Sequence, residues 1–324
     1  MQLSMGFATA AGVMAFFGSG SPGHPPAAPV PAVFAPGVIS GPADDAAPAF
    51  TPDGRTVYFM RGTDDGSTLM ESHLDGRWSA PRTVSFSGHW RDLDPAMAPD
   101  GSFLLFVSNR PAEAGGQPVD ATGTGKRRPG LGMNIWRVDR QQNGWGTPVR
   151  LPDAVNACGM TFAPSVAADG SIYFIGCAPP DIGLHLLRSL YREGRYQTPS
   201  PVSLGDVGAQ IRDPAIAPDG SYIVFSIKHD PAQPYRLAIA FHGRDGWSKP
   251  LDLGDAVNSG THSMGAQWGC DRRTLYFYSD RRLPSSDPDG AATWNNGGDN
   301  IWRVSLTPWL EAHGAGTSVV CTTG

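Results

Sequence analysis

The sequence has few charged side chains, little glutamate and little cysteine. Charged residues make up 17% of its 324 residues, the formal net charge is −5, and neither sign forms a long run. Nothing in this pattern predicts a nucleic-acid-binding surface or a basic membrane patch. No G-x-S-x-G nucleophile motif is present, which argues against a serine hydrolase domain within the chain.

No long apolar run that would span a bilayer is present either. Residues 1–20 are apolar from about Gly6 to Phe17, which is too short for a transmembrane helix. The stretch predicts a secretory signal peptide, although the usual basic residue before it is missing; the alternative is a misassigned start or a disordered tail. Residues 21–32 form a Pro/Ala-rich linker. We therefore expect a periplasmic or secreted protein that does not span a membrane.

Glycine and proline, in contrast, are abundant, with 41 and 30 residues, and they mark a repeat. The opening phrase of that repeat occurs five times. The copies are APAFTPDGRTVYFM (47–60), DPAMAPDGSFLLFV (94–107), APSVAADGSIYFIG (163–176), DPAIAPDGSYIVFS (213–226) and the degraded GAQWGCDRRTLYFY (265–278).

A complete copy predicts four short antiparallel strands. An apolar strand meets a Pro-Asp-Gly turn, and a β-branched and aromatic run follows as a second strand. A third strand resembles NIWRV (134–138), and a G-x-W or G-x-Y turn leads to a fourth. Four strands in about 50 residues are typical of a propeller blade, and blades must stack around an axis to bury their faces.

The ends of the chain indicate how the ring closes. The fifth copy lacks a clear fourth strand, whereas VFAPGVISG (33–41) parallels the fourth-strand phrases of other copies. We predict an all-β, five-bladed propeller over residues 33–306, its last blade completed by an N-terminal strand, which removes an open edge. Residues 307–324 form a C-terminal tail. Six blades are the alternative, with an extra blade hidden in 111–132 or 307–324.

The phrase D-P-A-x-x-P-D-G followed by N-I-W-R-V and G-W-x-x-P resembles the TolB-type, WD-like propeller repeat of bacterial envelope proteins. The resemblance covers residues 33–306. It implies the propeller fold and says little about activity, because related propellers include binding proteins, peptidase-attached domains and sugar lyases.

Loops on a rigid scaffold often carry function. In each blade, the loop that enters the innermost strand and the loop after the second strand lie on one face, here called the entry face. The Pro-Asp-Gly turns lie on the opposite face, here called the turn face. The predicted ligand-binding residues belong to the entry face: His89, Trp90, Arg91, Asp92, Arg110, Arg212, His229, His262 and Arg281.

These candidates differ in what they suggest. Arg91 and Arg212 suit a carboxylate or phosphate, because a guanidinium can hold both oxygens at once. His89 and His262 lack H-x-H or H-x-x-x-H spacing, so no metal or other cofactor is expected. Asp94 and Asp213 precede Pro in the repeated phrase and are interpreted as loop caps that accept backbone N–H bonds. The recurring Trp78, Trp145 and Trp247 are interpreted as blade-packing residues.

We therefore expect a binding scaffold, most simply a monomer, whose partner is an envelope protein, a peptide or a glycan and not a nucleic acid. The alternative is a polysaccharide lyase or glycoside hydrolase that uses His, Arg and Asp on the same face. Of only four glutamates, Glu113 alone lies in a loop that could reach the axis, which weakens this alternative.

The four cysteines form no C-x-x-C pair, and an even count in an exported chain permits two disulfides. Cys158 and Cys177 flank one hairpin, so folding at its turn brings them together. Cys270 in the last turn and Cys321 in the tail form the second expected bond.

Overall fold

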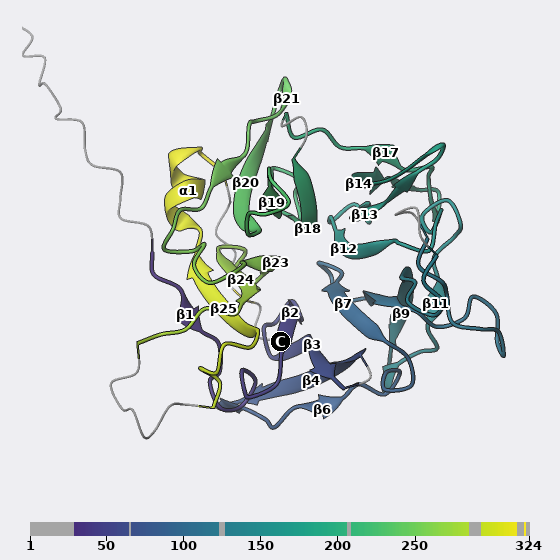
Figure 1. Cartoon of the computed structure of the whole chain (residues 1–324), viewed down its shortest axis with the longest axis horizontal. Coiled ribbons are helices and arrows are strands. Elements are labelled where there is room, and N and C mark those ends of the chain that lie inside the picture. Colours follow the sequence, from purple (N-terminus) through teal and green to yellow (C-terminus); the bar gives the residue numbers. More distant parts are fainter. Residues whose placement is uncertain are drawn as a thin grey trace, which may run out of the picture.

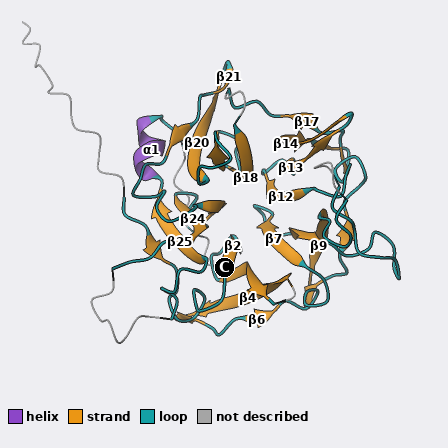
Figure 2. Ribbon diagram, in the orientation of Figure 1, coloured by secondary structure: helices purple, strands orange, loops and turns teal. Residues whose placement is uncertain are grey.

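The described part of the chain folds into five antiparallel blade sheets arranged around a central axis, with one small two-stranded sheet at the edge of blade 3 (Figure 1). The computed structural model describes residues 29–64, 66–122, 127–205, 209–284, 293–315 and 321. The predicted signal peptide at 1–20 and most of the linker lie outside the described residues. Figure 2 shows that strands and loops make up almost all of the ring. The predicted five-bladed propeller is confirmed.

Three strands of each blade run outward from the axis in chain order. The innermost strands are β2 (Asp45–Phe50), β7 (Asp92–Met97), β12 (Phe162–Val166), β18 (Gln210–Ile216) and β23 (Met264–Trp268). The second strands are β3 (Thr56–Thr63), β8 (Phe103–Ser108), β13 (Ile172–Ala178), β19 (Tyr222–Lys228) and β24 (Thr274–Ser279). The third strands are β4 (Gly66–Asp75), β9 (Asn134–Gln141), β14 (Asp181–Ser189), β20 (Arg236–Gly243) and β25 (Asn300–Ser305).

The outer edge of each blade is made of very short strands. In blades 1 to 4 these are β5 (Arg77–Trp78), β6 (Arg82–Thr83), β10 (Gly144–Trp145), β11 (Val149–Arg150), β15 (Tyr191–Arg192), β16 (Arg195–Tyr196), β17 (Ser200–Pro201), β21 (Gly246–Trp247) and β22 (Leu251–Asp252). Short edge strands expose few unpaired backbone groups, which limits pairing with other chains.

The N-terminal segment supplies the outer strand of blade 5. Strand β1 (Ala32–Val33) pairs antiparallel with β25, with Ala32 opposite Arg303, and the purple β1 lies beside the yellow β25 in Figure 1. The Phe34 N–H continues the ladder by donating to the Ile301 carbonyl oxygen at 2.8 Å. The expected closure is thus present, although the paired stretch is 32–34 and not the whole of 33–41, because the chain turns between Pro36 and Ser40.

All five innermost strands share a bulge that sequence analysis did not predict. The register shifts once in each, and one residue there has a positive φ. These five residues are Ala47, Asp94, Ala163, Asp213 and Gly265. A bulge re-aims the side chain at that point of the strand, and all five residues line the narrow centre of the channel.

Helix α1 (Thr307–Ala312) begins the segment that we interpreted as a tail. Its Leu310 is fully buried in the core cluster of blades 4 and 5, and the His313 ring stacks on Phe241 at 4.1 Å. These residues are therefore part of the folded ring. No helix in the described part of the chain is long and apolar enough to cross a bilayer.

Both disulfides join the expected pairs. Cys158 and Cys177 are bonded across the first hairpin of blade 3, and Cys270 and Cys321 connect the last turn to the C-terminal segment. In the described part of the chain no cysteine is free.

Candidate functional site

The narrowest level of the channel carries two acidic side chains. Asp94 from blade 2 and Asp213 from blade 4 line a cavity of only about 10 Å³, together with residues of the other three blades. That volume is close to the space of one water molecule. A sugar ring is far larger and does not fit between the two carboxyl groups.

The predicted capping role of this aspartate pair is confirmed, but the bonds cross between blades. The Asp94 Oδ2 accepts a bond from the Ala163 N–H at 3.1 Å, and the Asp213 Oδ2 accepts one from the Gly265 N–H at 3.3 Å. Each aspartate therefore joins its blade to the innermost strand of the next one. The repeated Asp-Pro phrase belongs to the assembly of the ring.

Protein surrounds both carboxyl groups, although each residue is only half-buried and so remains accessible to solvent. Burial raises the pKa of Asp94 to about 7, with a further contribution from the charge of Asp213 and opposition from the Ala163 N–H and Arg91. Burial also raises the pKa of Asp213. Two carboxyl groups this close do not both ionise freely, so the pair holds a proton at pH values where an exposed aspartate has lost its own.

Tyr278 occupies the position that a fifth side chain would take. A Cβ built on Gly265 would lie 2.4 Å from the Tyr278 ring, and Gly265 has φ +65°. Only glycine adopts this φ without strain and also avoids the clash with the Tyr278 ring. Burial, followed by the charges of Asp213, Asp94 and Asp299, raises the pKa of Tyr278 well above its usual value.

His262 lies beside this tyrosine at the entry face. Its ring contacts Tyr278 edge-on, with centroids 5.7 Å apart, and its Nε2 donates to the Asp299 Oδ1 at 2.7 Å. The bond to Asp299 raises the pKa of His262, and the charges of Asp280 and Asp44 add to this. The imidazole therefore carries a positive charge at pH values where an exposed histidine is neutral.

Arg91 and Arg212 stand next to the channel carboxyl groups. The positive charge of Arg91 opposes the rise in the pKa of Asp94, and that of Arg212 opposes the rise in the pKa of Asp213. The Arg91 side chain rests on the backbone of Gly66, and Arg212 lies over the Phe162 ring at 5.7 Å. Within the described ranges neither guanidinium forms a salt bridge.

Two other predicted site residues are paired inside their blade. Arg110 Nη2 donates to the Asp92 Oδ1 at 2.8 Å, and both side chains are buried. Blade 1 repeats the arrangement, with Arg61 Nε donating to the Asp45 Oδ1 at 2.7 Å. We therefore assign Asp92 and Arg110 to the packing of blade 2.

Blade 5 has the arginine of this pair without its carboxylate. Ser263 stands where Asp45 and Asp92 stand, two residues before the left-handed position. Arg281 lies over the Trp302 ring at 4.9 Å and donates to the Ala256 carbonyl oxygen at 2.8 Å. Its buried Nη1 has no partner among the described residues, and burial lowers the pKa of Arg281.

The remaining candidates lie further out. His89 and His229 are exposed and Trp90 is half-buried. No contact between His89 and His262 is present in the described part of the chain, and no group of three or more potential metal ligands occurs there.

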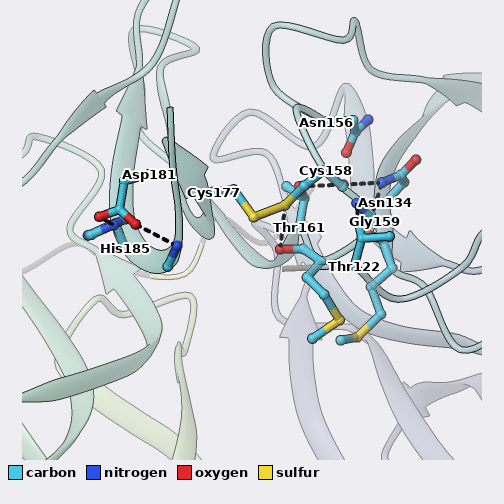
Figure 3. Close-up of a disulfide and its surroundings, with 12 residues drawn as sticks. Thr122, Asn134, Asn156, Cys158, Gly159, Thr161, Cys177, Asp181 and His185 are labelled. Atoms are coloured by element: carbon cyan, nitrogen blue, oxygen red, sulfur yellow. Dashed lines mark hydrogen bonds and ion pairs between the residues drawn. A yellow bond between two sulfur atoms is a disulfide. The ribbon is translucent and has the colours of Figure 1, made fainter. Parts of the chain in front are cut away.

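The insert 111–132 docks against blade 3. Gly159 N–H donates to the Thr122 Oγ1 at 3.0 Å, next to the Cys158–Cys177 disulfide (Figure 3), and Gly130 N–H donates to the Asp120 Oδ1 at 2.9 Å. Of its basic residues, Lys126 lies outside the described residues, while Arg127 pairs with Asp120. The Gly159–Thr122 bond joins the insert to blade 3, whereas the bonds of Asp120 to Gly130 and Arg127 lie within the insert.

Sequence analysis missed a larger pocket at the turn face. This vestibule of about 260 Å³ is lined by all five blades, including Phe50, Met97, Val166, Pro218 and Trp268. The signal was present in the prolines of the Pro-Asp-Gly turns, which we interpreted only as turn residues. Pro52, Pro99 and Pro218 converge on the pocket because the turns surround one axis.

Comparison with known proteins gives only distant structural similarity. No family model and no curated protein matches the chain. TolB from Acinetobacter baumannii is 13% identical over 80% of this chain and 53% of its own, with a TM-score of 0.47. An arabinanase from Bacillus subtilis is 10% identical over 80% and 93%, with a TM-score of 0.46. An oligogalacturonate lyase from Vibrio parahaemolyticus is 9% identical over 86% and 96%, with a TM-score of 0.37. The chain thus spans about half the length of the TolB structure.

Proposed function

We propose that this protein is an exported recognition scaffold that binds an acidic segment of its ligand at the entry face. The observation that carries the proposal is the state of Arg91 and Arg212. Arg61 and Arg110 are neutralised within their blades, whereas Arg91 and Arg212 form no salt bridge within the described ranges. Guanidinium groups of this kind favour bidentate contact with carboxylate or phosphate.

His262 lies at the entry face with Arg91 and Arg212, and its imidazolium is paired with Asp299. Loss of its proton would leave the Asp299 carboxylate without this counter-charge. The bond of His262 to Asp299 and the raised pKa favour the imidazolium form. An acidic peptide, an acidic protein segment or an acidic glycan supplies the matching charge. Export is supported by the two disulfides, because such bonds persist in oxidising compartments.

The proposal is tested with a fluorescein-labelled, glutamate-rich peptide and fluorescence anisotropy at low and high salt. Wild type should bind, and Arg91→Ala/Arg212→Ala should weaken binding at least ~10-fold, as expected for the loss of charged hydrogen bonds. Arg77→Ala/Arg192→Ala removes two exposed arginines from the turn-face hairpins and is the charge-matched control. Equal loss in both double variants would show only a net-charge effect.

A second candidate is a glycoside hydrolase or polysaccharide lyase. The raised pKa of Asp94, to about 7, favours it, because a general acid must hold a proton near neutral pH. The space of about 10 Å³ at the carboxyl pair opposes it. Incubation with a panel of polysaccharides, with and without EDTA, decides between the two: new reducing ends or ultraviolet absorbance from unsaturated sugars would establish the enzyme.

A further inference from the structure

Three of the five blades share one packing arrangement at the junction with the next blade. Three second strands carry a tyrosine at the same register, at Tyr58, Tyr173 and Tyr276. Tyr58 contacts Trp145 of the next blade edge-on at 5.6 Å. Tyr276 packs on Phe50 at 4.3 Å, within the cluster that Trp78 covers. At these two junctions the space beside the tyrosine is filled by aromatic rings.

The junction of blades 3 and 4 is open instead. Tyr173 and Trp247 both line a cavity of about 370 Å³. The ring contact of Trp247 is with His242, at 4.8 Å, and the partner over the Tyr173 ring is the Arg188 guanidinium, at 5.4 Å. A volume above 300 Å³ is in the range of small-molecule sites. The aromatic packing that fills the other two junctions is therefore absent here, and a ligand-sized space remains.

Arg188 gives this cavity a preference for anionic ligands. It lines the space, and its buried Nε–H has no hydrogen-bond partner within the described residues. The nearest carboxylate, Asp169, is 3.8 Å from Nη2, too far for a strong bond. The Arg188 side chain is 38% exposed and only loosely paired, so an anionic ligand in the cavity can contact its guanidinium in place of water.

The rest of the lining is polar. Ser200, Ser203, Asp219 and His242 surround the two aromatic rings. Hydroxyl, carboxylate and imidazole groups suit a ring that carries several hydroxyl groups, whereas an aromatic acid leaves most of them without a partner.

We infer that the cavity between blades 3 and 4 binds an acidic sugar residue, with its ring against Trp247 and Tyr173 and its carboxylate on Arg188. The site is separate from the entry-face mouth, because Arg91 and Arg212 do not line it. It lies on the side of the ring that carries the Asp219-Gly220 turn.

Saturation-transfer NMR tests this with sodium glucuronate, methyl glucoside and sodium benzoate as separate probes. Wild type should transfer saturation to glucuronate and much less to the other two. Arg188→Gln should reduce glucuronate binding at least ~10-fold, while Arg192→Gln, a neighbouring exposed arginine, should not. Ser203→Phe fills the cavity from an exposed position and should abolish binding even if Arg188→Gln proves unstable.

Several results would overturn the assignment. They are no binding of glucuronate to wild type, equal binding to Arg188→Gln or Ser203→Phe, or equal binding of benzoate or methyl glucoside. Loss of glucuronate binding in Arg91→Ala/Arg212→Ala would place the sugar at the entry face and so reject this cavity while supporting the mouth. Failure of the acidic-peptide experiment alone leaves the cavity assignment intact.

Discussion

Asp94 on blade 2 accepts a hydrogen bond from the backbone N–H of Ala163 on blade 3, at 3.1 Å, while its carboxyl group lines the channel. One side chain thus joins two blades and sets the charge at the centre of the ring. Its raised pKa, about 7, follows from that position. Stability and channel charge are therefore linked through the same proton.

Replacing Asp94 should change how stability depends on pH. Because its folded pKa is raised, the folded state binds the proton more tightly, and stability falls as pH rises from about 4 to about 7. Asp94→Asn should therefore stabilise the protein at pH 8 by about 2 kcal/mol. The full rise in the pKa of Asp94 would correspond to a larger free energy, but solvent in the channel reaches this carboxyl group. Urea denaturation at pH 5 and pH 8 measures this. An unchanged difference between the two pH values would contradict it.

Phe34 should hold the ring closed. It is 4% exposed and contacts Phe50, Trp78 and Tyr276, so Phe34→Ala should lower the free energy of unfolding by about 3–5 kcal/mol. Val30→Ala, at a side chain that is 80% exposed, is the control. Equal stability of the two variants would show that the N-terminal segment is not needed for closure.

The disulfide of blade 3 should stabilise the chain independently of the second one. Cys158 and Cys177 are 19 residues apart, and a loop of that size corresponds to about 3 kcal/mol. In a Cys270→Ser/Cys321→Ser background, reductant should lower the unfolding midpoint. In the variant with all four cysteines replaced by serine, reductant should have no effect; an effect there would point to another cause.

The protonation of His262 should control binding at the entry face. NMR titration should give a pKa above 6.5, which Asp299→Asn should lower. Acidic-peptide affinity should be high while the imidazole is charged and should fall as pH rises through its folded pKa. Affinity that stays constant over pH 5.5–8.5 would remove His262 from the proposed site.

Local patterns were enough to predict the architecture. The Pro-Asp-Gly turns fixed the hairpins, and the missing fourth strand of the last copy pointed to closure by the N-terminus, now seen at β1 and β25. Cys158 and Cys177 could be paired because they flank one hairpin turn. Asp45 and Arg61 are likewise equidistant from Asp53, so their ion pair could have been found by the same argument.

The site depended on features that sequence pattern does not carry. An Asp-Pro pair is typical of a capped loop, and only the left-handed bulge turns Asp94 and Asp213 toward the axis. Arg110 and Arg91 look alike in the sequence, yet one is paired within its blade and the other is not. Packing between blades decides both outcomes. The cavity beside Trp247 also arises from packing between blades, because the side chains around it leave a space unfilled.

The central claim, recognition of an acidic ligand at the entry face, is tested most directly by hydrogen exchange with the acidic peptide bound. The account predicts slower exchange at the amides of residues 87–92, 210–213 and 258–262. Exchange at the turn-face residues 52–54, 99–101 and 218–220 should be unchanged. Protection confined to those turns, or no protection on the entry loops under saturating peptide, would contradict it.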